Sequence, residues 1–277
     1  MKKILVPTDF SKTAHDAYLY ARSLAEKLNA SLEVVHAYTG TFNTNEPLIL
    51  EPLKGREEVL LDRLKAFCGE LPPQDEMVKT KVLVDCKAVQ TLNIANKLIK
   101  LSAEADLIVM GASGEHDVLE KIFGSVSSKV AQKAHCPVLL IPRGVTYKSP
   151  EKLLYASNWE SVQAGFIEKV IEFGGHFGSG IDFVHVCEEY GQEAFKKLEE
   201  EIFAILFKEK IPTFPFNLLE TKGQSPLAGL NKYAAEQTTD IIILVNRQDG
   251  LLENILGKSM TKEMAINAQF PILVYHM

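Results

Sequence analysis

The sequence predicts an α/β protein made of two tandem doubly wound domains, each with a five-stranded parallel sheet of strand order 3-2-1-4-5 and helices on both faces. Three observations support this prediction. The length of 277 residues exceeds that of one domain of about 100 to 150 residues. Short apolar runs alternate with stretches of helical period, as in a parallel sheet with crossover helices. The same order of elements then occurs twice along the chain.

In the first half, the apolar runs predict strands and the stretches between them predict helices. The near-continuous apolar character of the runs indicates strands buried on both faces. Ser11 is a candidate N-cap of the first helix, because apolar residues follow from Ala14 to Leu28 at spacings of three and four. The predicted strands are Lys3 to Pro7, Ser31 to Ala37, Val78 to Val84, Leu107 to Gly111 and Val138 to Pro142.

A polar stretch from Arg143 to Pro150, which holds both glycine and proline, predicts a linker between domains 1–145 and 151–277. Segments on its two sides match in the same order, which indicates a duplicated domain, because the period is far longer than that of a stacking repeat. The matched pairs are Lys3–Phe10 with Lys152–Trp159, Leu32–Ala37 with Asp182–Cys187, Asp106–Met110 with Asp240–Leu244, and Cys136–Leu140 with Phe270–Val274.

Composition and charge narrow the class of protein. A hydrophobic share of 46% and a charged share of 24% are typical of globular domains. The net charge of −6 repels nucleic acids and anionic membranes, so neither is expected as a partner. Pro7 and Asp9 end the first apolar run before it is long enough for a signal peptide or a membrane span, so we expect a cytoplasmic protein.

The cysteines are widely spaced and show neither a CxxC pair nor metal-ligand spacing. We therefore expect reduced, mostly buried thiols. They are Cys68, Cys86, Cys136 and Cys187.

A glycine-rich segment follows the fourth predicted strand. It runs Gly111-Ala112-Ser113-Gly114, then nine residues, then Gly124-Ser125-Val126-Ser127 at the start of a helical pattern. Glycines at the carboxyl end of a strand let the backbone approach a phosphate, and a helix N-terminus offers unpaired N–H groups. The hydroxyls of Ser125 and Ser127 are suited to donate to phosphate oxygens. Alternatively, the first two glycines form a tight turn and Ser125 caps a helix.

Asp9 directly follows the first strand, at the same sheet edge as Gly111 if the first and fourth strands are neighbours. Its carboxylate is suited to accept hydrogen bonds from a base amino group or a ribose hydroxyl. The alternative role is an Asx turn or a cap for the first helix. Together, Asp9 and the glycine segment favour a nucleotide ligand.

These motifs together resemble a universal stress protein domain of the UspA type. The opening Val6-Pro7-Thr8-Asp9, the strand Asp106 to Gly111, the G-x2-G-x9-G-[ST] segment and Cys136-Pro137-Val138-Leu139 stand in order. The resemblance extends over both halves and implies an ATP-binding first domain in a nucleotide-responsive regulatory protein of the stress response. The nucleotide-binding residues that it implies are Pro7, Thr8, Asp9, Val35, Ala37, Met110, Gly111, Gly114, Gly124, Ser125, Val126 and Ser127.

The resemblance also implies partners. Members of this family commonly dimerise through the edge strand, so the fifth strands Val138–Ile141 and Ile272–Tyr275 are expected to pair the two domains within the chain. A further homodimer is compatible with this, and a protein partner is expected but not named. Glu115 and Asp117 are candidate ligands for Mg²⁺ on the phosphates, although acids in an exposed loop are usually only solvated.

The second copy differs from the first at positions that are expected to bind the nucleotide in the first copy. Arg247 falls opposite Gly114, no glycine matches Gly111, and Asn158 replaces Asp9. We expect weak or no ATP binding there, because a side chain blocks the approach of the phosphate and an acceptor is lost. The alternative is that Arg247 and Lys258 bind phosphate by charge.

Two other functions stay open, namely a slow ATP hydrolase and an interaction module with a vestigial pocket. Gly257-Lys258-Ser259 resembles the end of a Walker loop but lacks the upstream glycine. The sequence also offers no clear candidate for a general base acting at a γ-phosphate. We therefore expect at most weak ATPase activity. His36 and His185, near the end of the second strand in both copies, are expected to be core residues rather than metal ligands.

Overall fold

A computed structural model describes residues 1–40, 55–69, 82–112, 125–157, 164–187, 192–208, 212–223, 226–246 and 270–276. The chain divides into two compact units, Met1–Tyr147 and Lys148–Tyr275. Among the helices of the described ranges, none combines the length and apolar character that crossing a membrane requires.

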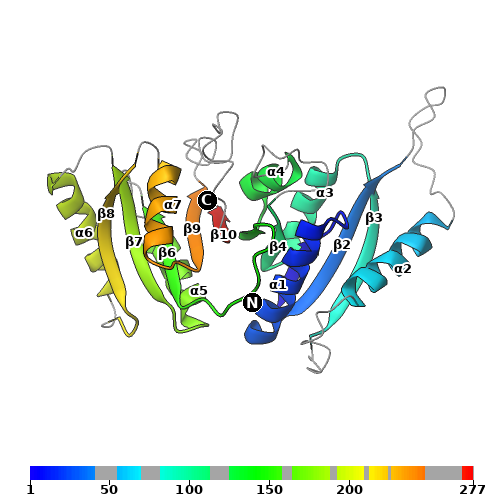
Figure 1. Ribbon diagram of the computed structural model, residues 1–277, viewed down its shortest axis with the longest axis horizontal. Coiled ribbons are helices and arrows are strands. Elements are labelled where there is room, and N and C mark those ends of the chain that lie inside the picture. Colours follow the sequence, from blue (N-terminus) through cyan, green and yellow to red (C-terminus); the bar gives the residue numbers. More distant parts are fainter. Residues whose placement is uncertain are drawn as a thin grey trace. The chain divides into compact units, whose positions relative to one another are not determined.

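The first unit contains one parallel sheet with the strand order β3-β2-β1-β4-β5 (Figure 1). This confirms the predicted order 3-2-1-4-5 and places β1 in the centre, between β2 and β4. Parallel strands run toward the same edge, so the residues that directly follow β1 and the carboxyl ends of β2 and β4 lie toward that edge. The strands are β1 (Lys3–Pro7), β2 (Ser31–Thr39), β3 (Val84–Thr91), β4 (Leu107–Gly111) and β5 (Val138–Ile141).

Helices cover both faces of this sheet, as predicted. Helices α1 (Lys12–Leu28) and α2 (Arg56–Gly69) share one face, where Tyr18 and Phe67 lie 5.5 Å apart between ring centroids. Helices α3 (Ile94–Leu101) and α4 (Ser125–Lys133) contact each other on the other face, with the 3-10 turn η1 (Ser102–Glu104) after α3 (Figure 1).

Helix α1 begins as the sequence predicts. The Ser11 hydroxyl accepts a hydrogen bond from the Ala14 N–H at 3.1 Å, and Asn29 ends the helix in a left-handed conformation with φ of 52°. The apolar stripe, including Ala17 and Leu24, is fully buried against the sheet.

The third strand is the one incorrect strand of the first half. The sequence predicts a strand from Val78 to Val84, whereas β3 runs from Val84 to Thr91. Of the predicted strand, residues 78–81 lie outside the described ranges, and residues 82 and 83 precede β3. Among the described strands of the first unit, the edge strand β3 pairs only with β2, and it is partly exposed along its length. It therefore lacks the continuous apolar run that identified the central strands.

The second unit repeats this architecture. Its strand order is β8-β7-β6-β9-β10, which is again third, second, first, fourth and fifth in chain order. The elements are β6 (Lys152–Ser157), α5 (Ala164–Gly175), β7 (Gly180–Cys187), α6 (Gln192–Leu206), β8 (Phe216–Lys222), α7 (Pro226–Glu236), β9 (Ile241–Asn246) and β10 (Ile272–His276).

The strand registers correct one detail of the repeat. Lys3 pairs with Ser31 in the first unit, and its counterpart Lys152 pairs with Gly180 in the second. Leu32–Ala37 therefore corresponds to Ile181–Val186, one residue earlier than the pairing made from sequence. The earlier pairing was wrong because both strands are apolar almost throughout, so a shift by one residue barely changes the match.

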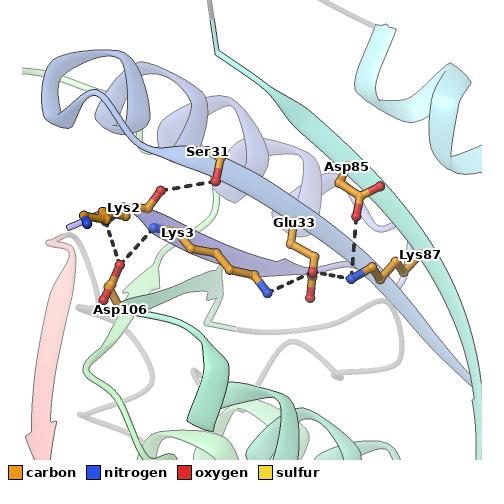
Figure 2. Close-up of polar contacts among 7 residues, drawn as sticks. All are labelled: Lys2, Lys3, Ser31, Glu33, Asp85, Lys87 and Asp106. Carbon is orange, nitrogen blue, oxygen red and sulfur yellow. Dashed lines mark hydrogen bonds and ion pairs between the residues drawn. The ribbon is translucent and has the colours of Figure 1, made fainter.

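The corrected register aligns an acid that is buried in each unit. Glu33 of β2 forms ion pairs with Lys3, at 3.0 Å, and with Lys87 of β3 (Figure 2). Burial raises the pKa of Glu33, but hydrogen bonds from Lys87 and Lys3 outweigh it and hold the pKa below its usual value. In the second unit, Asp182 forms the equivalent ion pair with Lys152 at 3.1 Å. The two units therefore share an internal contact as well as a strand order.

A second shared contact lies at the start of the fourth strand. Asp106 Oδ2 accepts hydrogen bonds from the backbone N–H groups of Lys2 and Lys3, at 2.6 and 2.9 Å (Figure 2). These bonds hold the pKa of Asp106 below its usual value. Asp240 accepts the same two bonds at the equivalent positions of the second unit, at 2.8 and 2.9 Å.

Candidate functional site

The end of β1 is joined to β2 at the carboxyl edge of the first sheet. Pro7, the last residue of β1, is buried, and the Thr8 N–H continues the parallel pairing by donating to the Val35 carbonyl at 2.9 Å. His36 Nδ1 then donates to the Thr8 carbonyl at 2.8 Å, which fixes the tautomer of the ring. Thr8, Val35 and His36 thus form one hydrogen-bonded group.

Asp9 is exposed at this edge and takes part in a turn. Its Oδ1 accepts a hydrogen bond from the Ser11 N–H at 3.0 Å, and the Thr8 hydroxyl accepts from the Phe10 N–H at 3.0 Å. The Asx turn that the sequence left open is therefore present, while the cap of α1 is Ser11 and not Asp9. The turn holds the exposed carboxylate in a defined place beside the end of β1.

Phe10, next to Asp9, has a left-handed backbone with φ of 65°, which is unfavourable for a residue with a bulky side chain. Its ring centroid lies 4.4 Å from that of His36 and 5.8 Å from that of Phe67, and the Arg63 guanidinium lies 4.1 Å above the ring. These contacts hold the strained turn in place. Sequence reasoning missed Phe10, Arg63 and Phe67, because their contacts join segments far apart in the chain.

At the end of β4, Gly111 packs tightly against the start of α1. A Cβ on this residue would lie 3.0 Å from Thr13 Cγ2 and 3.2 Å from both the backbone carbon and the oxygen of Thr13, at the start of α1. The sequence offered a phosphate approach or a tight turn as the reason for this glycine. The structure adds a third reason, namely that α1 crosses β4 closely at this point. Met110, the preceding residue, is buried.

Helix α4 begins at Ser125, and its first turn is tied to the end of β4. The Ser127 hydroxyl donates to the Ala112 carbonyl at 2.6 Å, and the Ser127 side chain is only 3% exposed. Val126 is half-buried. The hydroxyl hydrogen of Ser127 is thus directed to a backbone carbonyl, and the first turn of α4 is held close to the end of β4.

Several predicted positions lie outside the described residues. They are Gly114, Glu115, Asp117 and Gly124 in the first half, and Asn158, Arg247 and Lys258 in the second. The side chain of Ser125 is also outside the described part. The structure does bring together the end of β1, the stretch of β2 beside it, the end of β4 and the first turn of α4. These parts hold the remaining predicted residues: Pro7, Thr8, Asp9, Val35, Ala37, Met110, Gly111, Ser125, Val126 and Ser127.

The sequence of the first unit also matches a known family. The Universal stress protein family model covers residues 1–142, which is more than half of the chain. The chain belongs to the universal stress protein family. This confirms the resemblance found in the motifs that frame the site.

Individual relatives give the same result. A universal stress protein of Methanocaldococcus jannaschii is 29% identical over 148 residues, which cover 51% of this chain and 82% of the relative. One from Thermus aquaticus is 35% identical over 142 residues, covering 50% of this chain and 98% of the relative. The crystal structure of an Archaeoglobus fulgidus universal stress protein superposes with a TM-score of 0.68 at 16% identity, covering 99% of this chain and 96% of that one. At this identity, the superposition shows a shared fold.

The packing of Gly111 leads to a stability prediction for this universal stress protein. Gly111→Ala is expected to destabilise the first unit by roughly 1 to 3 kcal/mol, because the added methyl group meets backbone atoms of Thr13. Urea denaturation would measure the loss. Gly69→Ala is a matched control at the end of α2, where a Cβ has no neighbour within 4 Å among the described residues, and it is expected to be neutral. Equal stabilities of the two variants would contradict the packing role.

Proposed function

We propose that the first unit binds ATP at the carboxyl edge of its sheet, and that nucleotide occupancy makes the protein a regulator in the stress response. Family membership supports the stress-response role. The observation that carries the nucleotide proposal is the bond from Ser127 to the Ala112 carbonyl. It holds the N-terminus of α4 against the end of β4, which pairs with the strand that Asp9 follows, at the edge where open α/β sheets bind ligands.

The chemistry of the edge fits the parts of a nucleotide. The Asp9 carboxylate is suited to accept from a ribose hydroxyl or a base amino group. Val35 and Ala37 of β2 and Met110 of β4 are apolar residues near this edge and are suited to contact a base. The N–H groups in the first turn of α4 are suited to the phosphates, together with the backbone at Gly114 and Gly124. In this arrangement, Ser127 positions the helix and contributes its backbone.

Regulation by the nucleotide requires no chemical step. A ligand shifts a conformational equilibrium whenever it binds one state more tightly than another. Multiple-turnover hydrolysis of ATP well above the rate without protein, lost in Asp9→Ala, would assign an enzymatic function in place of the regulatory one.

The role of Asp9 is tested by substitution. Asp9→Ala is expected to weaken ATP binding roughly 10- to 100-fold, because it removes a charged acceptor worth about 1.5 to 3 kcal/mol. Isothermal titration calorimetry would measure the change. Asp62→Ala, which removes the same charge from an exposed position on α2, is the matched control and is expected to bind ATP as the wild type does. Equal affinities of the two variants would remove Asp9 from the site.

A further inference from the structure

Two cysteines of the first unit lie in contact although 18 positions separate them in the sequence. Cys68, in the last turn of α2, and Cys86, in the edge strand β3, have their sulfur atoms 3.7 Å apart. Both thiols are free. Both are also only half-buried, so small molecules can reach them from solvent. The third described cysteine, Cys136, is buried.

The backbone on each side of this pair is held in place. Phe67, next to Cys68, packs against His15 and Tyr18 of α1, with centroid distances of 5.1 and 5.5 Å. The Tyr18 hydroxyl donates to the Cys68 carbonyl at 2.9 Å. On the other side, Cys86 pairs in register with Val34 of β2. Rotation of the two side chains must therefore supply most of the change in sulfur–sulfur distance, from 3.7 Å to the roughly 2.0 Å of a disulfide.

We propose that Cys68 and Cys86 form a redox-active dithiol that a peroxide oxidises to an intramolecular disulfide between α2 and β3. This proposal is independent of nucleotide binding. Among the described residues, no group of three or more His, Cys, Asp or Glu side chains is placed to hold a metal ion, so the pair stands as a dithiol.

The order of the two steps follows from the surroundings of Cys68. Burial, followed by the neighbouring Cys86, raises the pKa of the Cys68 thiol to about 12, which disfavours its deprotonation, so we assign the first step to Cys86. The sulfur of Cys86 attacks one oxygen of hydrogen peroxide, its S–H proton passes to the departing oxygen as the O–O bond breaks, and that oxygen leaves as water.

The second step forms the disulfide. The sulfur of Cys68 attacks the sulfenic sulfur of Cys86 while its proton passes to the departing oxygen, so the S–S bond forms, the S–O bond breaks and a second water leaves. In total, two thiols and one peroxide give one disulfide and two waters, and two electrons pass from the thiols to the peroxide.

Peptide mapping after mild oxidation tests the proposal. The full chain would be treated with a small molar excess of hydrogen peroxide, alkylated, and digested with trypsin without reduction. The expected main disulfide joins the Cys68 peptide to Val82–Lys87, with free thiols falling from four to two per chain and returning with dithiothreitol. The melting temperature is expected to rise by several degrees on oxidation, because the bond closes a loop in the unfolded chain.

Single substitutions provide the controls. Cys86→Ser is expected to remove the cross-link, and Cys136→Ser, at the buried cysteine, is expected to leave it unchanged. Three results would overturn the proposal: disulfides formed mainly between chains, oxidation of Cys86 to sulfinic acid without a cross-link, or a Cys68 link made mainly to Cys136 or Cys187.

Discussion

Gly114→Arg is expected to reduce ATP binding by more than about 100-fold. The second copy carries Arg247 at the aligned position, so the substitution gives the first copy the residue type that the second copy has there. A glycine in a phosphate-binding segment lets the backbone come close to the ligand, and an arginine side chain would occupy that space. Calorimetric titration of the variant with ATP would measure the loss.

The reciprocal substitution is the control. Arg247→Ala removes the arginine from the second copy and is expected to leave ATP binding largely intact. If it instead weakened binding as much as Gly114→Arg does, the phosphates would be held by charge in the second copy and the proposed location of the site would be wrong.

Asp182→Ala is expected to destabilise the second unit by about 3 kcal/mol. Asp182 is only 1% exposed, and its carboxylate accepts from Asn217 Nδ2 at 2.7 Å and from the Tyr233 hydroxyl at 2.9 Å, besides pairing with Lys152 at 3.1 Å. Removing it leaves these partners without their acceptor in a largely buried place. Urea denaturation followed by the fluorescence of Trp159, the only tryptophan of the chain, would report the change.

Asp85→Ala is the matched control for this prediction. Asp85 also pairs with a lysine, Lys87, at 3.6 Å, but its side chain is 67% exposed, so its removal is expected to change stability by less than about 0.5 kcal/mol. A loss below about 1 kcal/mol for Asp182→Ala would show that the buried acid contributes little to the second unit.

The central strands were predictable because burial on both faces leaves a clear pattern in the sequence. Strands β1 and β4 have the predicted bounds, and Ser11 caps α1 as expected. The edge strand β3 was predicted at the wrong residues, because a partly exposed strand has no continuous apolar run. The repeat was recognised, but its register across β2 and β7 needed the observed strand pairing.

The position of two candidate site residues was predictable from the order of the strands. Asp9 and Gly111 were expected at one edge if the first and fourth strands are neighbours, and β1 and β4 do pair. The packing of Gly111 on Thr13, the Arg63 contact with Phe10 and the proximity of Cys68 to Cys86 were not predictable, since each joins separate elements. Sequence spacing predicts which residues contact each other within one helix or strand. Contacts between separate elements become known only from the three-dimensional structure.

Titration of the wild-type protein with ATP by isothermal calorimetry tests the central claim most directly. The proposal predicts a dissociation constant below the order of 1 mM and a stoichiometry of a single ATP per chain, because only the first copy keeps Asp9 and the complete glycine segment. An absence of binding at millimolar ATP would contradict nucleotide binding. A stoichiometry of two per chain would contradict the asymmetry between the copies.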